Sequence, residues 1–190
     1  MDVFDAIGKR RSCRSFKDIP FDHELLERIL EAALWAPSPK NAQPWEFVVV
    51  TNRDIRKKIY CEAEARRKWV LEKSGWRWLE NYNVDFLKAV PVIVAVIGDP
   101  DRSGADQFLP EGGMGYQHAC AAAVQNMLLA ACALNIGSLW FSLFDPVVIR
   151  DILGLSSSKL PIALVCLGYP KGDPQSPGRK GLERVVRYIR

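Results

Sequence analysis

Hydrophobic and polar positions recur with two different periods along this chain, and each change of period predicts an element. In several segments apolar residues return at the spacing of a helix that packs on one face. These expected helices are 2–9, 21–35, 53–75, 116–134 and 146–153. Short runs of β-branched and aromatic residues predict strands at 46–51, 90–97, 138–142 and 161–168. Between them the pattern weakens over 76–88, where we expect an irregular, mobile segment.

The order of these elements predicts an α+β fold. Helix and strand do not alternate as a doubly wound sheet requires, and helices dominate around four or five strands. The length of 190 residues suits a single domain spanning 1–190. Residues 100–111 read as a loop, and a Gly/Pro-rich linker at 171–181 precedes an extended ending at 182–188. An arm exchanged between the subunits of a dimer would explain that ending.

Composition excludes several classes of protein. Hydrophobic residues make up 48% of the chain and charged residues 25%, as in soluble globular proteins. A net charge of +4, with interspersed acidic residues, argues against a nucleic-acid surface and favours a local anion site. The apolar run 118–141 carries Gln125 and Asn126 in its middle, so it predicts a buried helix and no membrane span.

Cysteine and histidine usage argues against disulfides and metal sites. The five cysteines are unclustered, odd in number and without a C-x-x-C spacing, which favours a reduced intracellular environment. His23 and His118 each lack a second His at helical spacing, so no metal is expected. The amino terminus carries Asp2 and Asp5 and no apolar signal segment, which predicts a cytoplasmic location. Glycines at 112–115 fail the dinucleotide-binding pattern and are interpreted as a flexible start of the next helix.

Two polar segments carry the candidate chemistry. Residues 10–16 include Arg10, Arg11 and Arg14, and guanidinium groups present a fixed fork of donors to phosphate and to carbonyl or ring-nitrogen acceptors. Residues 36–47 form a loop with Pro at both ends, whose hydroxyl and amide groups can hold a planar ligand. Taken alone, the arginine cluster is consistent with a solvated helix end, and the Pro-bounded loop with an ordinary helix-to-strand connection. Together they predict a site for a flavin bearing one phosphate.

These segments resemble the nitroreductase-like FMN oxidoreductase family. Its members open with an Arg-rich, Ser-containing turn like 10–16 and continue with an Ala-Pro-Ser…Asn-x-Gln-Pro-Trp loop like 36–45. Residues 163–170 are similar to the family's Ala-x-x-x-x-Gly-Tyr-Pro strand and turn. The resemblance implies an obligate homodimer with a mixed central sheet of four to five strands flanked by helices, and two FMN sites at the subunit interface. It also implies that 171–190 form a C-terminal arm reaching the partner subunit.

The resemblance assigns roles to individual residues. Those implied to bind the cofactor are Arg10, Arg11, Ser12, Arg14, Pro37, Ser38, Asn41, Gln43, Asn83, Ser142, Leu143, Arg179 and Lys180. The basic residues at the two ends of the chain are implied to hold phosphate and ribityl, with Arg14 at the pyrimidine edge. Loop 37–43 would close the partner's site, Asn83 would bond the pyrimidine ring, and backbone amides of 142–143 would reach flavin N5.

Several of these residues have plainer interpretations. Asn83 is equally suited to a turn, and the pair at 179–180 can simply solubilise a tail. Aromatic residues in the variable wall over the flavin can stack on a planar substrate or pack in the core or interface. They are Trp69, Trp76, Trp78 and Tyr82. Pro39 and Leu143 depart from the family pattern. Pro39 would remove a hydroxyl contact, and Leu143 would narrow the pocket or alter the approach to N5.

The implied activity is that of a flavoenzyme. It would take hydride from NADH or NADPH at flavin N5 and reduce a second small substrate, such as a nitro compound or a quinone, in the same pocket. No side-chain nucleophile or acid–base pair stands out, as expected where the cofactor carries the chemistry. Two alternatives stay open: a non-catalytic FMN carrier or redox sensor whose pocket is blocked, and a relative specialised for dehalogenation, flavin breakdown or dehydrogenation.

Overall fold

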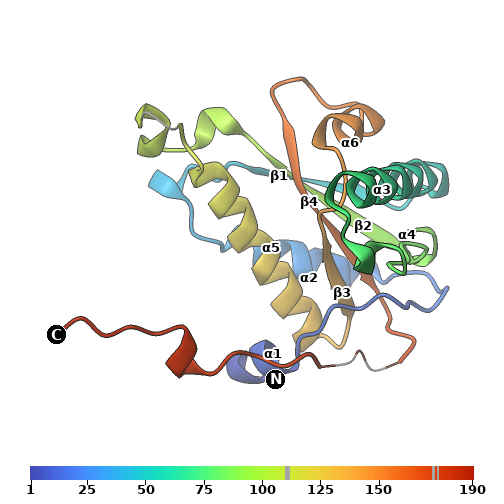
Figure 1. Cartoon of the computed structure of the whole chain (residues 1–190), viewed down its shortest axis with the longest axis horizontal. Helices are drawn as coiled ribbons and strands as arrows, with labels where there is room; N and C mark the ends of the chain where they lie inside the picture. Colours follow the sequence, from blue (N-terminus) through green and yellow to red (C-terminus); the bar gives the residue numbers. More distant parts are fainter. Residues whose placement is uncertain (110–111, 173, 175) are drawn as a thin grey trace.

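An antiparallel sheet forms the centre of the molecule (Figure 1). The computed structural model describes residues 1–109, 112–172, 174 and 176–190. Within this part of the chain the strands are β1 (Trp45–Val50), β2 (Val92–Gly98), β3 (Gly137–Phe141) and β4 (Leu160–Gly168), in the order β1-β2-β4-β3. These strands pair antiparallel. The parallel component of the expected mixed sheet is therefore limited, among described residues, to one bridge between Ser12 and Ser138.

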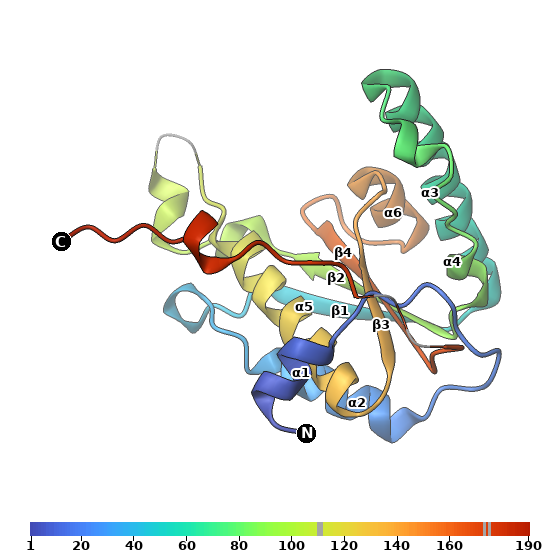
Figure 2. The same cartoon turned by 60° about the horizontal axis from the view of Figure 1, so that its bottom comes forward.

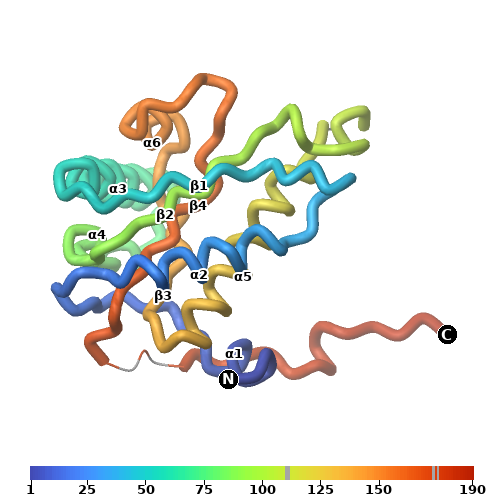
Figure 3. The backbone as a smooth tube through the Cα atoms, turned by 180° about the vertical axis from the view of Figure 1, so that it is seen from behind, coloured from blue at the N-terminus to red at the C-terminus, as the bar shows by residue number. Residues whose placement is uncertain are grey.

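Helices cover both faces of the sheet, which confirms the α+β fold. The helices α2 (His23–Leu34) and α5 (Gly115–Ala133) lie side by side on one face (Figure 3). On the other face lie α3 (Arg53–Ser74), α4 (Phe86–Ala89) and α6 (Pro146–Ile152), whereas α1 (Val3–Lys9) packs against α5 (Figure 2). The ranges expected from the sequence agree with these bounds to within one or two residues.

The central strands β2 and β4 are apolar without interruption because both of their faces are covered. Alternate side chains of a strand point to opposite faces. From β2, Val92, Val94 and Val96 pack in the core beneath α2 and α5. Ile93, Ala95 and Ile97 pack in the core beneath α3, α4 and α6.

The helix α5 confirms the buried helix expected from the apolar run. Its residues pack against the sheet, α1 and α2, so most of its surface is covered. Asn126 in its middle donates through Nδ2 to the backbone oxygen of Ala32 in α2, 3.0 Å away. No helix in the described part of the chain is long and apolar enough to cross a bilayer.

The start of α5 is closely packed at Gly113 and Gly115, whereas nothing lies within 4 Å of an added Cβ on Gly112, so the expected flexible glycine run is corrected only at the first two of these positions. A Cβ on Gly115 would collide with the backbone oxygen of Ser103. Asp106 Oδ2 accepts a bond from the Gly115 N–H at 2.6 Å. Burial by itself would raise the pKa of Asp106. The hydrogen bonds from Gly115, Ser103 and Met114 together outweigh burial, so that the pKa lies below its usual value. A carboxylate therefore caps the helix where only glycine fits.

Two irregular segments complete the chain. Residues 76–85 are irregular as expected, with a 3₁₀ turn at Arg77–Leu79, but the expected segment 76–88 ends in a short helix, α4, that the sequence pattern did not predict. Leu79, Val84 and Leu87 are fully buried and anchor this region to the core. The carboxyl-terminal segment leaves the body of the molecule (Figure 1), and a 3₁₀ turn at Leu182–Arg184 interrupts the expected extended chain. Residues 110 and 111 of the expected loop, and 173 and 175 of the expected linker, lie outside the described residues.

Candidate functional site

The arginine-rich turn follows the edge of the sheet. The Cys13 N–H donates to the Ser138 oxygen in β3 at 2.9 Å, and the Lys17 N–H donates to the Tyr169 oxygen beyond β4 at 2.8 Å. These backbone hydrogen bonds hold both ends of the segment 13–17 on the sheet. The backbone is therefore fixed at Arg14, which lies between the two bonds, and close to Arg10 and Arg11, which precede them.

Paired glycines make room for this segment. Gly137 and Gly168 face each other in the register of β3 and β4. A Cβ on Gly137 would lie 2.9 Å from Cys13 Sγ, and a Cβ on Gly168 would lie 2.8 Å from Phe16 Cδ1. Cys13 and Phe16 are buried and anchor the segment to the sheet. Their side chains fit there because the neighbouring residues are glycines without a Cβ. Burial also raises the pKa of the Cys13 thiol, which stays neutral beneath the arginines.

The two ends of the chain enclose a basic cavity of about 370 Å³. Its lining residues are Arg10, Arg11, Ser12, Arg14, Ser176, Pro177 and Arg179. Among these described residues there is no carboxylate, and guanidinium groups converge from segments far apart in the sequence. Such a donor set matches a compact anion such as phosphate. Lys180 is exposed and is not among the described lining residues.

The arginines differ in the contacts they already make. Arg11 Nη1 donates to the backbone oxygens of Gly8 and Arg10, each at 2.7 Å, at the end of α1. Arg11 therefore caps the helix in addition to contributing charge. Arg179 Nη1 donates to the backbone oxygen of Gly178 at 3.1 Å.

Arg14 also lines a second cavity, of about 650 Å³. The other lining residues are Trp78, Asn81, Tyr82, Asn83, Asp85 and Phe86. The guanidinium carbon of Arg14 lies 5.6 Å from the centre of the Tyr82 ring, a cation–π contact. A basic cavity and an aromatic, polar cavity therefore meet at one arginine.

Asn83 and two of the four aromatic residues expected over the flavin, Trp78 and Tyr82, line this second cavity. Asn83 Oδ1 accepts from the Asp85 N–H at 2.6 Å, which confirms the turn-forming interpretation and leaves its amide group as a donor. Trp78 meets the edge of Tyr82 with ring centres 5.3 Å apart. Trp69 lies elsewhere, 5.2 Å from the guanidinium carbon of Arg66.

Ser142 and Leu143 follow β3 directly. Ser142 is exposed, whereas Leu143 packs against the core beneath α3 and α6. Neither residue lines a described cavity, so the narrowing of the flavin pocket by Leu143 stays a prediction.

The Pro-Ser loop is a strained, internally bonded turn. Lys40, Asn41 and Gln43 have φ angles of 51°, 54° and 45°, values that residues other than glycine rarely adopt. Ser38 Oγ accepts from the Gln43 N–H at 3.0 Å, and Arg102 Nη1 donates to the Gln43 oxygen at 3.3 Å. The loop is therefore preorganised, with Pro37 exposed at its start.

Within one subunit this loop lies far from the arginines. Pro39 in the loop lies next to Gly115 at the start of α5, since its Cγ would be 3.0 Å from a Cβ added to that glycine. At the other end of α5, Cys132 lines a cavity together with Arg10. A helix of 19 residues is about 28 Å long. The loop and the basic cavity therefore sit at opposite ends of α5 (Figure 1).

Comparison with known proteins identifies the family of this chain. The model of the Nitroreductase family matches residues 7–169. The chain belongs to the nitroreductase family. Within that family, an NADH dehydrogenase of Thermus thermophilus is 32% identical, with 99% of this chain and 96% of the relative covered. Iodotyrosine deiodinase 1 of Mus musculus is 26% identical, with 97% of this chain and 68% of the relative covered.

A solved structure extends the likeness of this nitroreductase-family chain to three dimensions. A candidate nitroreductase from Desulfovibrio desulfuricans, crystallised in complex with FMN, is similar with a TM-score of 0.78 and 27% identity. The likeness covers 100% of this chain and 98% of that chain. The nitroreductase fold implied by the sequence motifs is thereby confirmed.

Sequence reasoning missed five residues that line the two cavities, one of which is the buried Phe86 of α4. Asn81 and Asp85 flank Tyr82 and Asn83, so polar residues within an aromatic segment were the available signal. Ser176 and Pro177 belong to the Gly/Pro-rich linker, whose composition gives no sign that it returns to the first turn.

Proposed function

We propose that this protein is an FMN-dependent oxidoreductase that takes hydride from NADH or NADPH and reduces a second small substrate. The observation that carries the proposal is the basic cavity, where Arg10, Arg14 and Arg179 converge without a neutralising carboxylate among its described lining residues. FMN bears one phosphate, and a single compact cluster of guanidinium groups fits that group. The relative solved with FMN has the same fold.

Arg14 connects the phosphate site to the ring site in this proposal. The residues of the basic cavity would hold the phosphate and ribityl chain, and those of the second cavity would hold the isoalloxazine ring, where Asn83 offers an amide donor. A reduced flavin gathers negative charge along its pyrimidine edge, and the fixed cation of Arg14 there favours the reduced form. The flavin supplies the hydride chemistry at N5, while the protein binds and orients it.

The proposed site needs two subunits. Ser38, Asn41 and Gln43 lie a helix length from Arg10 in one chain, so both groups contact the same FMN only if the loop belongs to a partner. Exposed apolar residues support such a homodimer. Phe4 of α1 is 81% exposed and Trp35 at the end of α2 is 86% exposed, and both gain by burial in an interface.

A nitro compound, a quinone or a similar planar acceptor fits the aromatic wall formed by Trp78 and Tyr82. A specialised reductive activity is the second candidate, favoured by the likeness to iodotyrosine deiodinase. A blocked carrier or sensor is less well supported, because Leu143, the residue that would block the pocket, is partly buried against the core.

Anaerobic mixing of the purified protein with each nucleotide tests the function. We expect the protein to be yellow, and NADH or NADPH to bleach the flavin before any acceptor is added. Bleaching by dithionite but by neither nucleotide would support the carrier or sensor. Release of FAD, or of no flavin, on denaturation would contradict the cofactor assignment itself.

A further inference from the structure

A closed ring of bonds joins α3 to the turn that follows β3. Glu62 Oε1 accepts from the Asp145 N–H at 2.9 Å and from Arg66 Nε at 3.2 Å. Arg66 Nη2 donates to Asp145 Oδ2 at 2.7 Å, which closes the ring. Arg66 and Asp145 are 79 residues apart in the sequence, so the ring is a tertiary contact between two elements.

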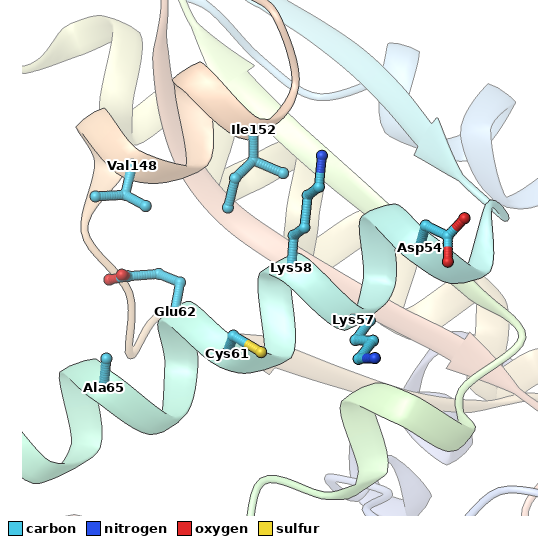
Figure 4. Close-up of a pocket in the computed structure, with 8 residues that line it drawn as sticks. All are labelled: Asp54, Lys57, Lys58, Cys61, Glu62, Ala65, Val148 and Ile152. Carbon is cyan, nitrogen blue, oxygen red and sulfur yellow. The ribbon is translucent and has the colours of Figure 1, made fainter.

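The ring is partly shielded from water. The exposed fractions of the Glu62, Arg66 and Asp145 side chains are 9%, 23% and 32%. Figure 4 shows Glu62 pointing from α3 toward the segment that leads into α6. Hydrogen bonds between charged groups are stronger where water is excluded, so this ring restrains the segment it holds.

The restrained segment carries the residues implied to face flavin N5. Ser142 and Leu143 lie just before Asp145, and Phe144 between them and the ring is buried. Asp145 Oδ1 also accepts from the Val147 N–H at 2.9 Å, which caps α6. The turn is therefore held from the inside by Leu143 and Phe144 and at its end by the ring, while Ser142 is exposed.

Arg67, the next residue of α3, offers a matched comparison. Its guanidinium bonds Glu64 within the helix, as Arg66 bonds Glu62, and its side chain is 15% exposed. Its long-range bond goes elsewhere, from Nη1 to the Leu79 oxygen at 2.6 Å in the aromatic segment. The two arginines share a helix, a charge and a similar burial, but only Arg66 reaches the turn.

We propose that Glu62 and Arg66 are positioning residues that hold the 142–145 turn in the shape it presents to the flavin. They act through Asp145 and belong to the opposite side of the turn from the exposed Ser142. The consequence for the flavin rests on the proposed function, whereas the restraint of the turn does not depend on it.

Hydrogen exchange tests the restraint without any flavin. In Arg66→Ala and Glu62→Ala we expect exchange of amides 142–145 to rise about tenfold, because charge-assisted bonds that hold the turn are lost. Arg67→Ala should leave these amides unchanged, and Glu62→Gln, which keeps an acceptor oxygen, should stay close to the unmodified protein. Arg66→Lys retains the charge with a poorer fit, so it gives an intermediate rate even if Arg66→Ala does not fold.

Flavin reduction tests the consequence. In the FMN-loaded protein we expect Arg66→Ala to slow reduction by NADH or NADPH about tenfold and to shift the flavin potential, with the potential unchanged in Arg67→Ala. Turn exchange equal in the Arg66→Ala and Arg67→Ala variants would overturn the proposal, as would faster exchange with unaltered reduction. If the unmodified protein binds no FMN, the proposed function is overturned. The hydrogen-exchange comparison would still show whether Glu62 and Arg66 restrain the turn.

Discussion

At the scale of single residues, Gly168 is one of the two glycines against which the arginine-rich segment packs. A Cβ at this position would lie 2.8 Å from Phe16 Cδ1 and 2.8 Å from Pro91 Cδ. Phe16 is one of the buried side chains that anchor the arginine-rich segment to the sheet. Any atom added at Gly168 must therefore displace either the segment or the chain that leads into β2.

Gly168→Ala should weaken both the fold and the site. We expect a loss of about 1–3 kcal/mol in the free energy of unfolding, the usual effect of overpacking, together with weaker FMN binding. Denaturant unfolding and flavin titration measure the two effects. Gly172→Ala is the matched control, because nothing lies within 4 Å of an added Cβ there. Equal behaviour of the two variants would show that Gly168 does not set the position of the segment.

Site residues were predictable where a motif fixes both residue type and spacing. Arg10 and Arg14 were singled out in this way, and the structure places them with Arg179 around one cavity. Asn83 kept two interpretations, and its bond to the Asp85 N–H supports the turn. For Asn81 the only signal was a polar residue within an aromatic segment, because its place in the cavity that Arg14 lines follows from tertiary packing.

At the scale of elements, an ion pair joins the end of β2 to the start of β4. Lys159 Nζ lies 2.9 Å from Asp99 Oδ2. The Lys159 hydrogen bond lowers the pKa of Asp99 against the opposing effect of burial. The Asp99 N–H also donates to the Pro44 oxygen at 2.9 Å, which ties the same corner to the Pro-Ser loop.

Asp99→Asn should remove a pH-dependent contribution to stability. Because the folded pKa of Asp99 is lowered, its contribution is fully present above the unfolded value of about 3.9 and is lost as pH falls through the folded pKa. We expect the variant to be about 1 kcal/mol less stable near neutral pH, and the difference to vanish in acid. Denaturant unfolding across this range measures it, with the exposed Asp101→Asn as control. A difference independent of pH would contradict the ion-pair account.

Element positions were predictable because their periods are local. The continuous apolar run of β2 and the capped, amphipathic α2 need no knowledge of the rest of the fold. The close packing at Gly115 was not predictable, because it depends on an atom that local pattern does not specify, the Ser103 oxygen. The turn at Leu182–Arg184 was missed although its backbone bonds run between near neighbours in the sequence.

At the scale of the whole molecule, α5 separates the two halves of the proposed flavin site. If a partner's loop completes the site, dimer formation and FMN binding are thermodynamically linked, so that whatever favours one favours the other. The exposed arm supports this arrangement, since Leu182, Val185 and Tyr188 are apolar or aromatic and largely in solvent. The expectation of one domain over 1–190 stays a prediction.

Truncation after Gly172 should therefore lower dimer stability and flavin occupancy together, because it removes the arm and the basic pair Arg179 and Lys180. Replacing that pair by Ala while keeping the arm should reduce flavin affinity and leave the dimer largely intact. Sedimentation with simultaneous detection of flavin absorbance separates the two effects. A truncated protein that is monomeric but fully loaded with FMN would show that the site is not shared.

The basic cavity as the phosphate site is the central claim, and titration of the apoprotein with FMN and with riboflavin tests it most directly. Arg10→Ala should lose about 1.5–3 kcal/mol of FMN binding, the value of a charge-assisted contact, and should bind riboflavin, which has no phosphate, as before. Arg53→Ala, an exposed arginine outside the described cavity lining, controls for net charge. Unchanged FMN affinity in a folded Arg10→Ala protein, or an equal loss for both flavins, would contradict the account.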